Sequence, residues 1–411
     1  MLLRPKSLRS EALESYMIRL ADLYGYTSQQ LIERFHIILD EEDQKLSGAL
    51  PGNLWQLNIY HANTSSSFRV ECLEVLAEKM GRGRLPIMEL AVYRSRTKYG
   101  LRHHSLFWQG LDIPRFYVRK ECIPVCPLCF QEDEKPFMPF YWHLHLVRAC
   151  SKHGCKLIEQ CPDCMESLNY IHTGNLKGCS CGKEYKSMPA EIAPEPLIHL
   201  AAKVQEEKVT AENFDNLLFE LEDIHQLFGM ILWFYSYVAE RGSKRSFTDE
   251  TLLDCIAFFD KWPQNLHTLL KEKIETAIVL ADRRFSETSF QSIFRNLLFA
   301  SKRLPSNVLS SNPVLKEVFT YLDQCIHADN ELSEIGYSLL NGYEVATLLD
   351  TDDEQVARLL DEGKLPVSKR LKDSTAFNPK IPLFPLKSTF NVWLAGFQSR
   401  LSNRHIYMSR W

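Results

Sequence analysis

The sequence predicts a mainly α-helical protein with a central pair of zinc-binding, ribbon-like modules. Apolar residues recur at the 3.6-residue spacing of helices on both sides of the centre. Eight cysteine and histidine side chains form close pairs between Cys126 and Cys181. A helix-turn-helix pattern lies near each end of the chain. These observations predict an N-terminal helical domain with a helix-turn-helix (residues 1–120), tandem zinc-binding modules (121–190), a helical domain (191–335) and a C-terminal helix-turn-helix with a basic tail (336–411).

Length and composition indicate a folded protein of several domains. The chain has 411 residues, of which 45% are hydrophobic and 24% are charged, as is typical of globular proteins. The apolar segment at the start of the sequence is too short and too charged for a signal peptide. The longest apolar run, Phe228 to Ala239, is shorter than a membrane span. We therefore expect a protein of the bacterial cytoplasm without membrane contact. There the 12 cysteines should stay reduced, which favours metal binding over disulfides.

Charge is distributed unevenly along the chain. The net charge is −4, whereas a nucleic-acid coat protein is usually strongly basic. Basic residues predominate from Gly81 to Lys120 and from Asp361 to Trp411, and acidic residues predominate from Ala190 to His225. The pattern fits separate surfaces for a polyanion and for basic partners. It fits equally well with charges that only solvate helical faces.

The first predicted element is a pair of helices. Residues 10–24 have apolar side chains at helical spacing, with Ser10 as the N-cap and Gly25 as the C-cap. Thr27 and Gln30 then form a capping box for a second helix. Three residues stand at the positions that a helix-turn-helix requires: Ala21, Gly25 and Leu31. Many helical hairpins share this pattern without touching DNA, so contact with nucleic acid and contact with protein stay equally open.

The rest of the N-terminal domain is expected to contain a loop, two helices and a basic stretch. Asp40 to Gly52 is polar with glycines and a proline, which predicts a loop, and we expect helices over Asn53 to Tyr60 and over Phe68 to Met80. Basic and aromatic residues interleave from Arg82 to Lys120, a mixture that can hold a phosphate backbone or stack on bases. The alternative, which we favour, is a basic face packed on the zinc modules with its aromatic residues in the core.

The cysteine and histidine pairs have the spacing of two tetrahedral zinc sites. We assign the first site to Cys126, Cys129, Cys150 and His153, and the second to Cys161, Cys164, Cys179 and Cys181. The last pair is one residue tighter than usual, which the flanking Gly178 and Gly182 allow. Cys122 and Cys155 are spare thiols, and Cys155 is the candidate to replace His153 as a ligand.

Both sites have four protein ligands, which leaves no position open for water or substrate. Two zinc ions per chain are therefore expected to be structural. No catalytic residue is assigned, because the sequence has no phosphate-binding loop and no nucleophile motif that would indicate an enzyme. His143 and His145 lie between the ligand pairs, and alternation on a short strand explains them better than ligation. The scattered Cys72, Cys255 and Cys325 are expected in the core.

The C-terminal half is predicted to be helical and to end in a second helix-turn-helix. Its first helix is expected over Gly342 to Leu349, and its second begins with a capping box from Thr351 to Glu354 and ends at Gly363. The second helix is acidic, so this module fits a protein partner. If it meets DNA, the better contacts are Lys369, Arg370 and Lys372.

The order of these motifs resembles the TniQ/TnsD family of transposon target-selection proteins. The resemblance is carried by CPLC from Cys126, CSKHGCKL from Cys150, CPDC from Cys161 and CSCG from Cys179, with the helix-turn-helix in front of them. The segment from Phe258 to Pro263 is similar to a Trp-Pro segment in the family's C-terminal half.

The resemblance implies one of two functions. Short TniQ members carried by CRISPR-associated transposons are homodimeric adaptors that dock on the guide-RNA effector Cascade and recruit the AAA+ regulator TnsC. TnsD-type members instead bind an attachment site in DNA. The moderate length and the negative net charge favour the adaptor. In a homodimer we expect the helix-turn-helix of one copy to meet the C-terminal half of the other, and direct contact with DNA or RNA stays open.

Overall fold

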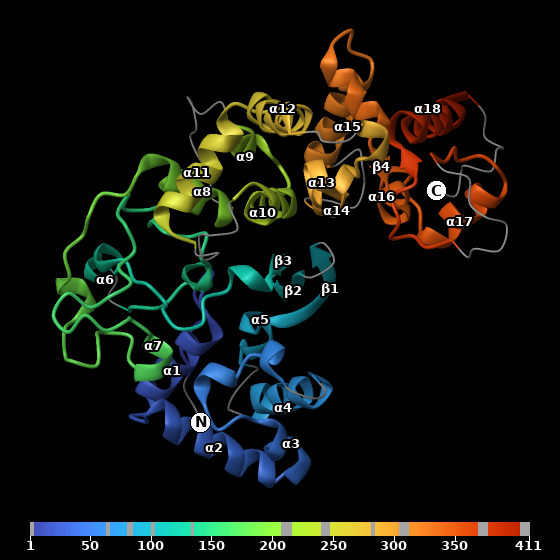
Figure 1. Cartoon of the computed structure of the whole chain (residues 1–411). Helices are drawn as coiled ribbons and strands as arrows, with labels where there is room; N and C mark the ends of the chain where they lie inside the picture. Colours follow the sequence, from blue (N-terminus) through green and yellow to red (C-terminus); the bar gives the residue numbers. More distant parts are fainter. Residues whose placement is uncertain are drawn as a thin grey trace. The chain divides into compact units, whose positions relative to one another are not determined.

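The structure, a computed structural model, describes residues 4–62, 66–79, 85–99, 103–132, 135–206, 216–239, 247–280, 284–302, 304, 312–368 and 377–402. The chain divides into two compact units, Met1–Asp215 with Ser246–Ile256, and Asn216–Arg245 with Ala257–Trp411 (Figure 1). Regular structure in both units is mainly helical, as predicted. Within the described ranges no helix is long and apolar enough to span a membrane. The finer division into four domains stays a prediction.

The first unit contains short helices, one small sheet and the cysteine-rich segment. Its helices are α1 (Leu13–Leu23), α2 (Ser28–Asp40), α3 (Gln44–Ala49), α4 (Ser66–Lys79), α5 (Ile87–Leu90), α6 (Pro127–Glu132), α7 (Tyr170–Thr173) and α8 (Glu195–Val204). Short 3-10 turns are η1 (Leu54–Gln56), η2 (Ile59–His61), η3 (Arg115–Tyr117), η4 (Phe140–His143) and η5 (Tyr185–Ser187). The sheet consists of β1 (Tyr93–Tyr99), β2 (His103–Trp108) and β3 (Leu111–Pro114). Helix α11 (Asp249–Asp260) begins in this unit and ends in the second.

Helices α1 and α2 are joined by a short turn. Gly25 has a φ of 68°, the left-handed conformation in which a side chain is strained. The Thr27 hydroxyl oxygen accepts from the Gln30 N–H, and the Gln30 side-chain oxygen accepts from the Thr27 N–H. The predicted capping box is therefore confirmed. Ser10 is not the N-cap, because α1 begins only after Ala12. The result is a tight helical hairpin, a geometry that DNA-binding and protein-binding modules share.

Two predictions for the following segment are wrong. The expected loop from Asp40 to Gly52 contains α3, because Asp43 caps the Lys45 N–H and Leu46 is buried. The expected helix from Asn53 to Tyr60 forms only η1 and η2. Buried Asn58 separates them, because its amide oxygen accepts from the Val92 N–H at 2.7 Å.

The basic stretch forms a three-stranded antiparallel sheet that was not predicted. Strand β2 pairs with β1 on one side and β3 on the other. Gln109 and Gly110 both have positive φ and close a two-residue hairpin between β2 and β3. The exposed positions include Arg94, Arg96 and Lys98, and the buried ones include Tyr99, Leu106 and Trp108. The expected core placement of the aromatic residues holds for Tyr99 and Trp108 but is wrong for Phe107, which is 40% exposed. Arg82, Arg84 and Arg102 lie outside the described residues.

The second unit is a set of helices around an aromatic core. It contains α9 (Leu217–Glu220), α10 (Ile224–Trp233), the π-turn η6 (Phe234–Val238), α12 (Gln264–Val279), η7 (Phe285–Glu287), α13 (Phe290–Phe294), α14 (Leu297–Lys302), α15 (Pro313–Ile326), η9 (Glu331–Tyr337), α16 (Gly342–Leu348), α17 (Asp353–Asp361) and α18 (Leu386–Ser402). Strands β4 (Leu339–Leu340) and β5 (Phe384–Pro385) form a short ladder. Trp233 is fully buried beside Phe258, Phe259 and Trp262. The Trp-Pro segment therefore helps to build this core.

Helices α16 and α17 occupy the predicted second helix pair. Asp350 lies in the turn with a φ of 54°. The predicted cap is wrong by one residue, since Asp352 and not Thr351 caps α17 by accepting from the Gln355 N–H at 2.8 Å. Gly363 follows the end of α17 with a φ of 68°. The predicted DNA contacts Lys369, Arg370 and Lys372 lie outside the described residues.

Candidate metal centres

The first cluster brings together one helix end and one tight turn. Cys126 directly precedes α6 and Cys129 lies within it. Cys150 and His153 lie in a turn that is closed by the Cys150 N–H, which donates to the Cys155 carbonyl at 2.8 Å. Two backbone hydrogen bonds between Val125 and Ile158 hold the helix end against the strand segment that leaves the turn. Four ligand atoms, from Cys126, Cys129, Cys150 and His153, thus lie within 4.8 Å of one another.

The distances in this cluster fit a tetrahedral ion. The Nδ1 atom of His153 lies 3.4, 3.3 and 3.5 Å from the Sγ atoms of Cys126, Cys129 and Cys150. The Sγ atoms of Cys129 and Cys150 are 3.7 Å apart. A zinc ion with its usual bond lengths separates two sulfurs by roughly 3.8 Å and a sulfur and a nitrogen by roughly 3.6 Å. Three thiols and one imidazole at these spacings are a donor set that suits zinc.

A carboxylate lies beside the outer nitrogen of the histidine ligand. The Nε2 atom of His153 lies 3.0 Å from a carboxylate oxygen of Glu132, which also pairs with Lys152 at 2.6 Å. A carboxylate on the far nitrogen of a histidine fixes the ring and strengthens it as a metal ligand. Glu132 was missed in the sequence, although its position three residues after Cys129 on α6 places both on one helix face.

The second cluster is made of two tight turns. The Cys161 N–H donates to the Glu166 carbonyl at 2.9 Å, and the Cys179 N–H donates to the Lys183 carbonyl at 2.9 Å. Gly182 has a φ of 93°, and a Cβ at Gly178 would lie 2.6 Å from the Lys183 carbonyl oxygen. Both glycines are therefore needed for the short second turn, as predicted. The ligand atoms of Cys161, Cys164, Cys179 and Cys181 all lie within 4.8 Å of one another.

The other candidates lie outside these clusters. The Sγ of Cys155 is 3.5 Å from that of Cys126, so Cys155 borders the first cluster. Cys122 contacts the Glu159 carbonyl, and burial raises the pKa of its thiol to about 11. His143 lies in a 3-10 turn and not on the predicted strand, with its Nε2 atom 2.9 Å from the Tyr170 hydroxyl. The ring of His145 stacks on Phe247, so neither histidine reaches a cluster.

A partly buried ion-pair network connects parts of the cysteine-rich segment. Glu159 pairs with both Arg119 and Arg148, and Arg148 reaches Asp249 at the start of α11 at 2.6 Å. Arg119 is buried, and it also donates to the carbonyls of Leu144 and Val147. These contacts join segments with little regular structure. With four donors each, they would hold an ion without exposing it to substrate.

The N-terminal part of the chain matches a family model. The model is described as TniQ, and the match covers residues 2–157. It includes the α1–α2 hairpin, the sheet and the first cluster, and it ends before the second cluster. No curated protein matches the chain. Residues 2–157 therefore form a TniQ domain, which is typical of a family of transposon-associated target-selection proteins.

Proposed function

We propose that this protein is a target-selection adaptor of DNA transposition. In this proposal a homodimer links the guide-RNA effector Cascade to the TnsC regulator and thereby to the transposase. The TniQ match over residues 2–157 carries the proposal, and the resemblance to short members of CRISPR-associated transposons supplies the partners. We also propose that the protein is not an enzyme, because a zinc ion with four protein ligands has no open position for a substrate.

The surface of the α1–α2 hairpin supports a protein partner. Leu23, Tyr26 and Ile37 are 47%, 39% and 48% exposed. The exposed charged residues on α2 are mixed: Glu33, Arg34 and Asp40. A phosphate backbone would favour a basic surface, which these mixed charges do not form.

Co-purification tests the adaptor role. A tagged chain should retain Cascade with its guide RNA and, in a separate experiment, TnsC. Ile37→Asp should weaken the retention of at least one partner about tenfold, because an unpaired carboxylate would be buried in the contact. Ile381→Asp changes a residue with similar exposure, 46%, in the second unit and serves as the control. Retention of neither partner by the folded wild type would contradict the proposal.

Direct recognition of an attachment site is the second candidate function. The observation that favours it is the row of exposed cationic residues on β1, which are Arg94, Arg96 and Lys98. A mobility-shift assay with random and candidate duplexes separates the two functions. Weak and salt-sensitive binding is expected for the adaptor, and tight binding to one sequence would favour the site-binding protein.

Light scattering should give about twice the chain mass of 47.7 kDa for the proposed homodimer.

A further inference from the structure

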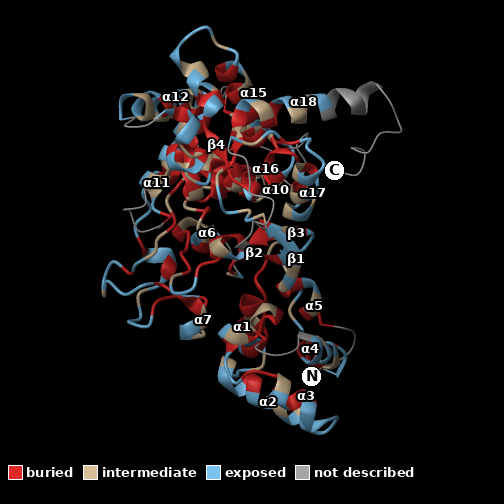
Figure 2. Ribbon diagram, turned by 45° about the vertical axis from the view of Figure 1, so that its right-hand side comes forward, coloured by how far each residue is buried: buried red, intermediate tan, exposed pale blue. Residues whose placement is uncertain are grey.

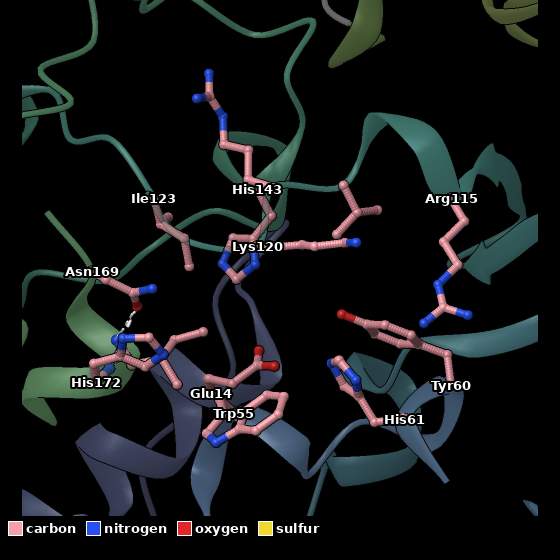
Figure 3. A pocket seen from close by; sticks show the side chains of 13 residues that line it. Glu14, Trp55, Tyr60, His61, Arg115, Lys120, Ile123, His143, Asn169 and His172 are labelled. Atoms are coloured by element: carbon pink, nitrogen blue, oxygen red, sulfur yellow. Dashed lines mark hydrogen bonds between the residues drawn. The ribbon is translucent and has the colours of Figure 1, made fainter. Parts of the chain in front are cut away.

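The first unit contains a cavity of about 260 Å³ that none of the eight clustered cysteine and histidine residues lines (Figure 3). Its lining comes from α1, the η1–η2 segment, the residues after β3 and the region around α7. Ligand pockets usually enclose ~300–1,000 Å³. This cavity therefore suits one small ligand or a single unit of a polymer.

A buried carboxyl group with an unused oxygen lies at the floor of this pocket. The Oε1 atom of Glu14 accepts from the Asn58 side chain at 2.5 Å. Its Oε2 atom is buried and has no hydrogen-bond partner among the described residues. A buried polar atom without a partner is costly, so this oxygen is suited to receive a donor from a ligand. The first helix is thus connected directly to the pocket.

Flat rings form one wall. The ring centres of Tyr60 and His61 are 3.9 Å apart, and those of Trp55 and His61 are 5.6 Å apart. Trp55 is 43% exposed, so its ring is accessible. Burial and the nearby Arg115 lower the pKa of His61 to about 4, which leaves a neutral ring near pH 7. Neutral and accessible aromatic faces are suited to stacking on a planar ligand.

Two exposed cations border the pocket. The Arg115 guanidinium lies 5.9 Å from the centre of the Tyr60 ring, and Lys120 is exposed. In Figure 3 the Lys120 amine and the Tyr60 hydroxyl extend into the same space as the Glu14 carboxyl group. Arg119 also lines the pocket, but its guanidinium is buried and paired with Glu159. The rim therefore offers positive charge above a floor that accepts hydrogen bonds.

We propose that this pocket binds one unpaired nucleotide. The N–H edge of the base meets Glu14, the base stacks on Trp55, and the phosphate lies between Arg115 and Lys120. The side chains of an acidic peptide offer no flat ring to stack on Trp55 and no donor for Glu14 when they are ionised, and a cationic side chain would meet the positive rim. Cytosine should be preferred over uracil, because its exocyclic amine donates to a carboxylate, whereas carbonyl oxygens flank the single N–H of uracil.

Fluorescence anisotropy with labelled single-stranded oligocytidine and oligouridine tests this assignment. Wild type should bind oligocytidine about tenfold more tightly than oligouridine. Trp55→Ala should weaken oligocytidine binding about tenfold, and Glu14→Gln should bring the ratio of the two affinities close to one. Lys186→Ala is the control for charge, because Lys186 is exposed and outside the pocket, and it should bind as wild type does.

The outcomes separate the two sources of such a ligand. Displacement by free cytidine monophosphate supports a free nucleotide, and displacement only by an unlabelled strand supports a nucleotide within a strand. Wild-type affinity of both Trp55→Ala and Glu14→Gln for oligocytidine would overturn the assignment. If circular dichroism shows that Glu14→Gln does not fold, the half-exposed Trp55 decides alone. The test needs neither Cascade nor TnsC, so its result is independent of the adaptor role.

Discussion

Glu14 couples the stability of the first unit to pH. Burial raises the pKa of its carboxyl group from 4.5 to about 7. The other ionisable groups around it are Tyr60, Tyr170 and the pocket residues His61, Arg115, Arg119, Lys120, His143 and His172. Because the folded pKa is raised, the contribution of this group to stability is full below pH 4.5 and is lost as the pH rises through 7. Gln at this position stays neutral at every pH.

Glu14→Gln should therefore reduce the pH dependence of unfolding. Between pH 6 and pH 8 the wild type should lose about 1 kcal/mol of stability relative to the variant. Denaturant unfolding followed by circular dichroism at both pH values measures this difference. The titrations of the cysteines and histidines occur in both proteins and cancel in the comparison. A difference that does not change with pH would show that Glu14 keeps the same charge in the folded and unfolded chains.

His153 and Cys155 are the two candidates for the fourth ligand of the first cluster. The His153 ring nitrogen faces three sulfurs, whereas Cys155 is near only the Sγ of Cys126. His153→Ala should therefore lower the zinc content from about two ions per chain to about one, and Cys155→Ser should leave it at two. Mass spectrometry of the metal after dialysis gives the count. The reverse result would make Cys155 the ligand.

Glu132 should tune the affinity of the same cluster. Removal of an outer carboxylate from a histidine ligand typically lowers metal affinity 10–100-fold, so Glu132→Ala should lose one zinc ion to a competing chelator at a lower chelator concentration than wild type. Glu184→Ala, which removes an exposed carboxylate whose ion-pair partner among the described residues is Lys186, is the matched control. Equal resistance of both variants to the chelator would show that Glu132 does not act on the metal.

The turn between α1 and α2 is the element on which the hairpin depends. Gly25 has positive φ and free space around it, so alanine there would strain only the backbone. Gly25→Ala should destabilise the unit by roughly 1–2 kcal/mol. Gly48 also has free space but lies inside α3, so Gly48→Ala should be neutral or stabilise by about 0.5–1 kcal/mol. Denaturant midpoints of the two variants check this contrast, and equal effects would contradict it.

Elements with local signals could be predicted, and those that depend on distant contacts could not. The caps of α2, the turn glycine and the pairing of cysteines are encoded within a few residues. The sheet is formed by short strands of mixed composition, and the Gln109–Gly110 hairpin was its one local signal. The role of Glu14 depends on Asn58, which is distant in the sequence. Figure 2 shows both buried and exposed residues within the small sheet.

At the scale of the whole molecule, metal removal should affect the two units differently. Both clusters lie in the first unit, where the segment from Cys126 to Cys181 has little regular structure, so ions bound there would contribute folding energy. The second unit has its own apolar core around Trp233.

A chelator should therefore increase amide hydrogen exchange in residues 120–190 at least tenfold, while α10 and α15 keep their protection. Exchange measured by mass spectrometry with and without chelator shows this directly, and added zinc should restore the protection. Cys72→Ala removes a buried thiol outside both clusters and should respond to the chelator as wild type does. Equal loss of protection in both units would mean that they unfold as one cooperative body, and the metal would then stabilise the whole chain.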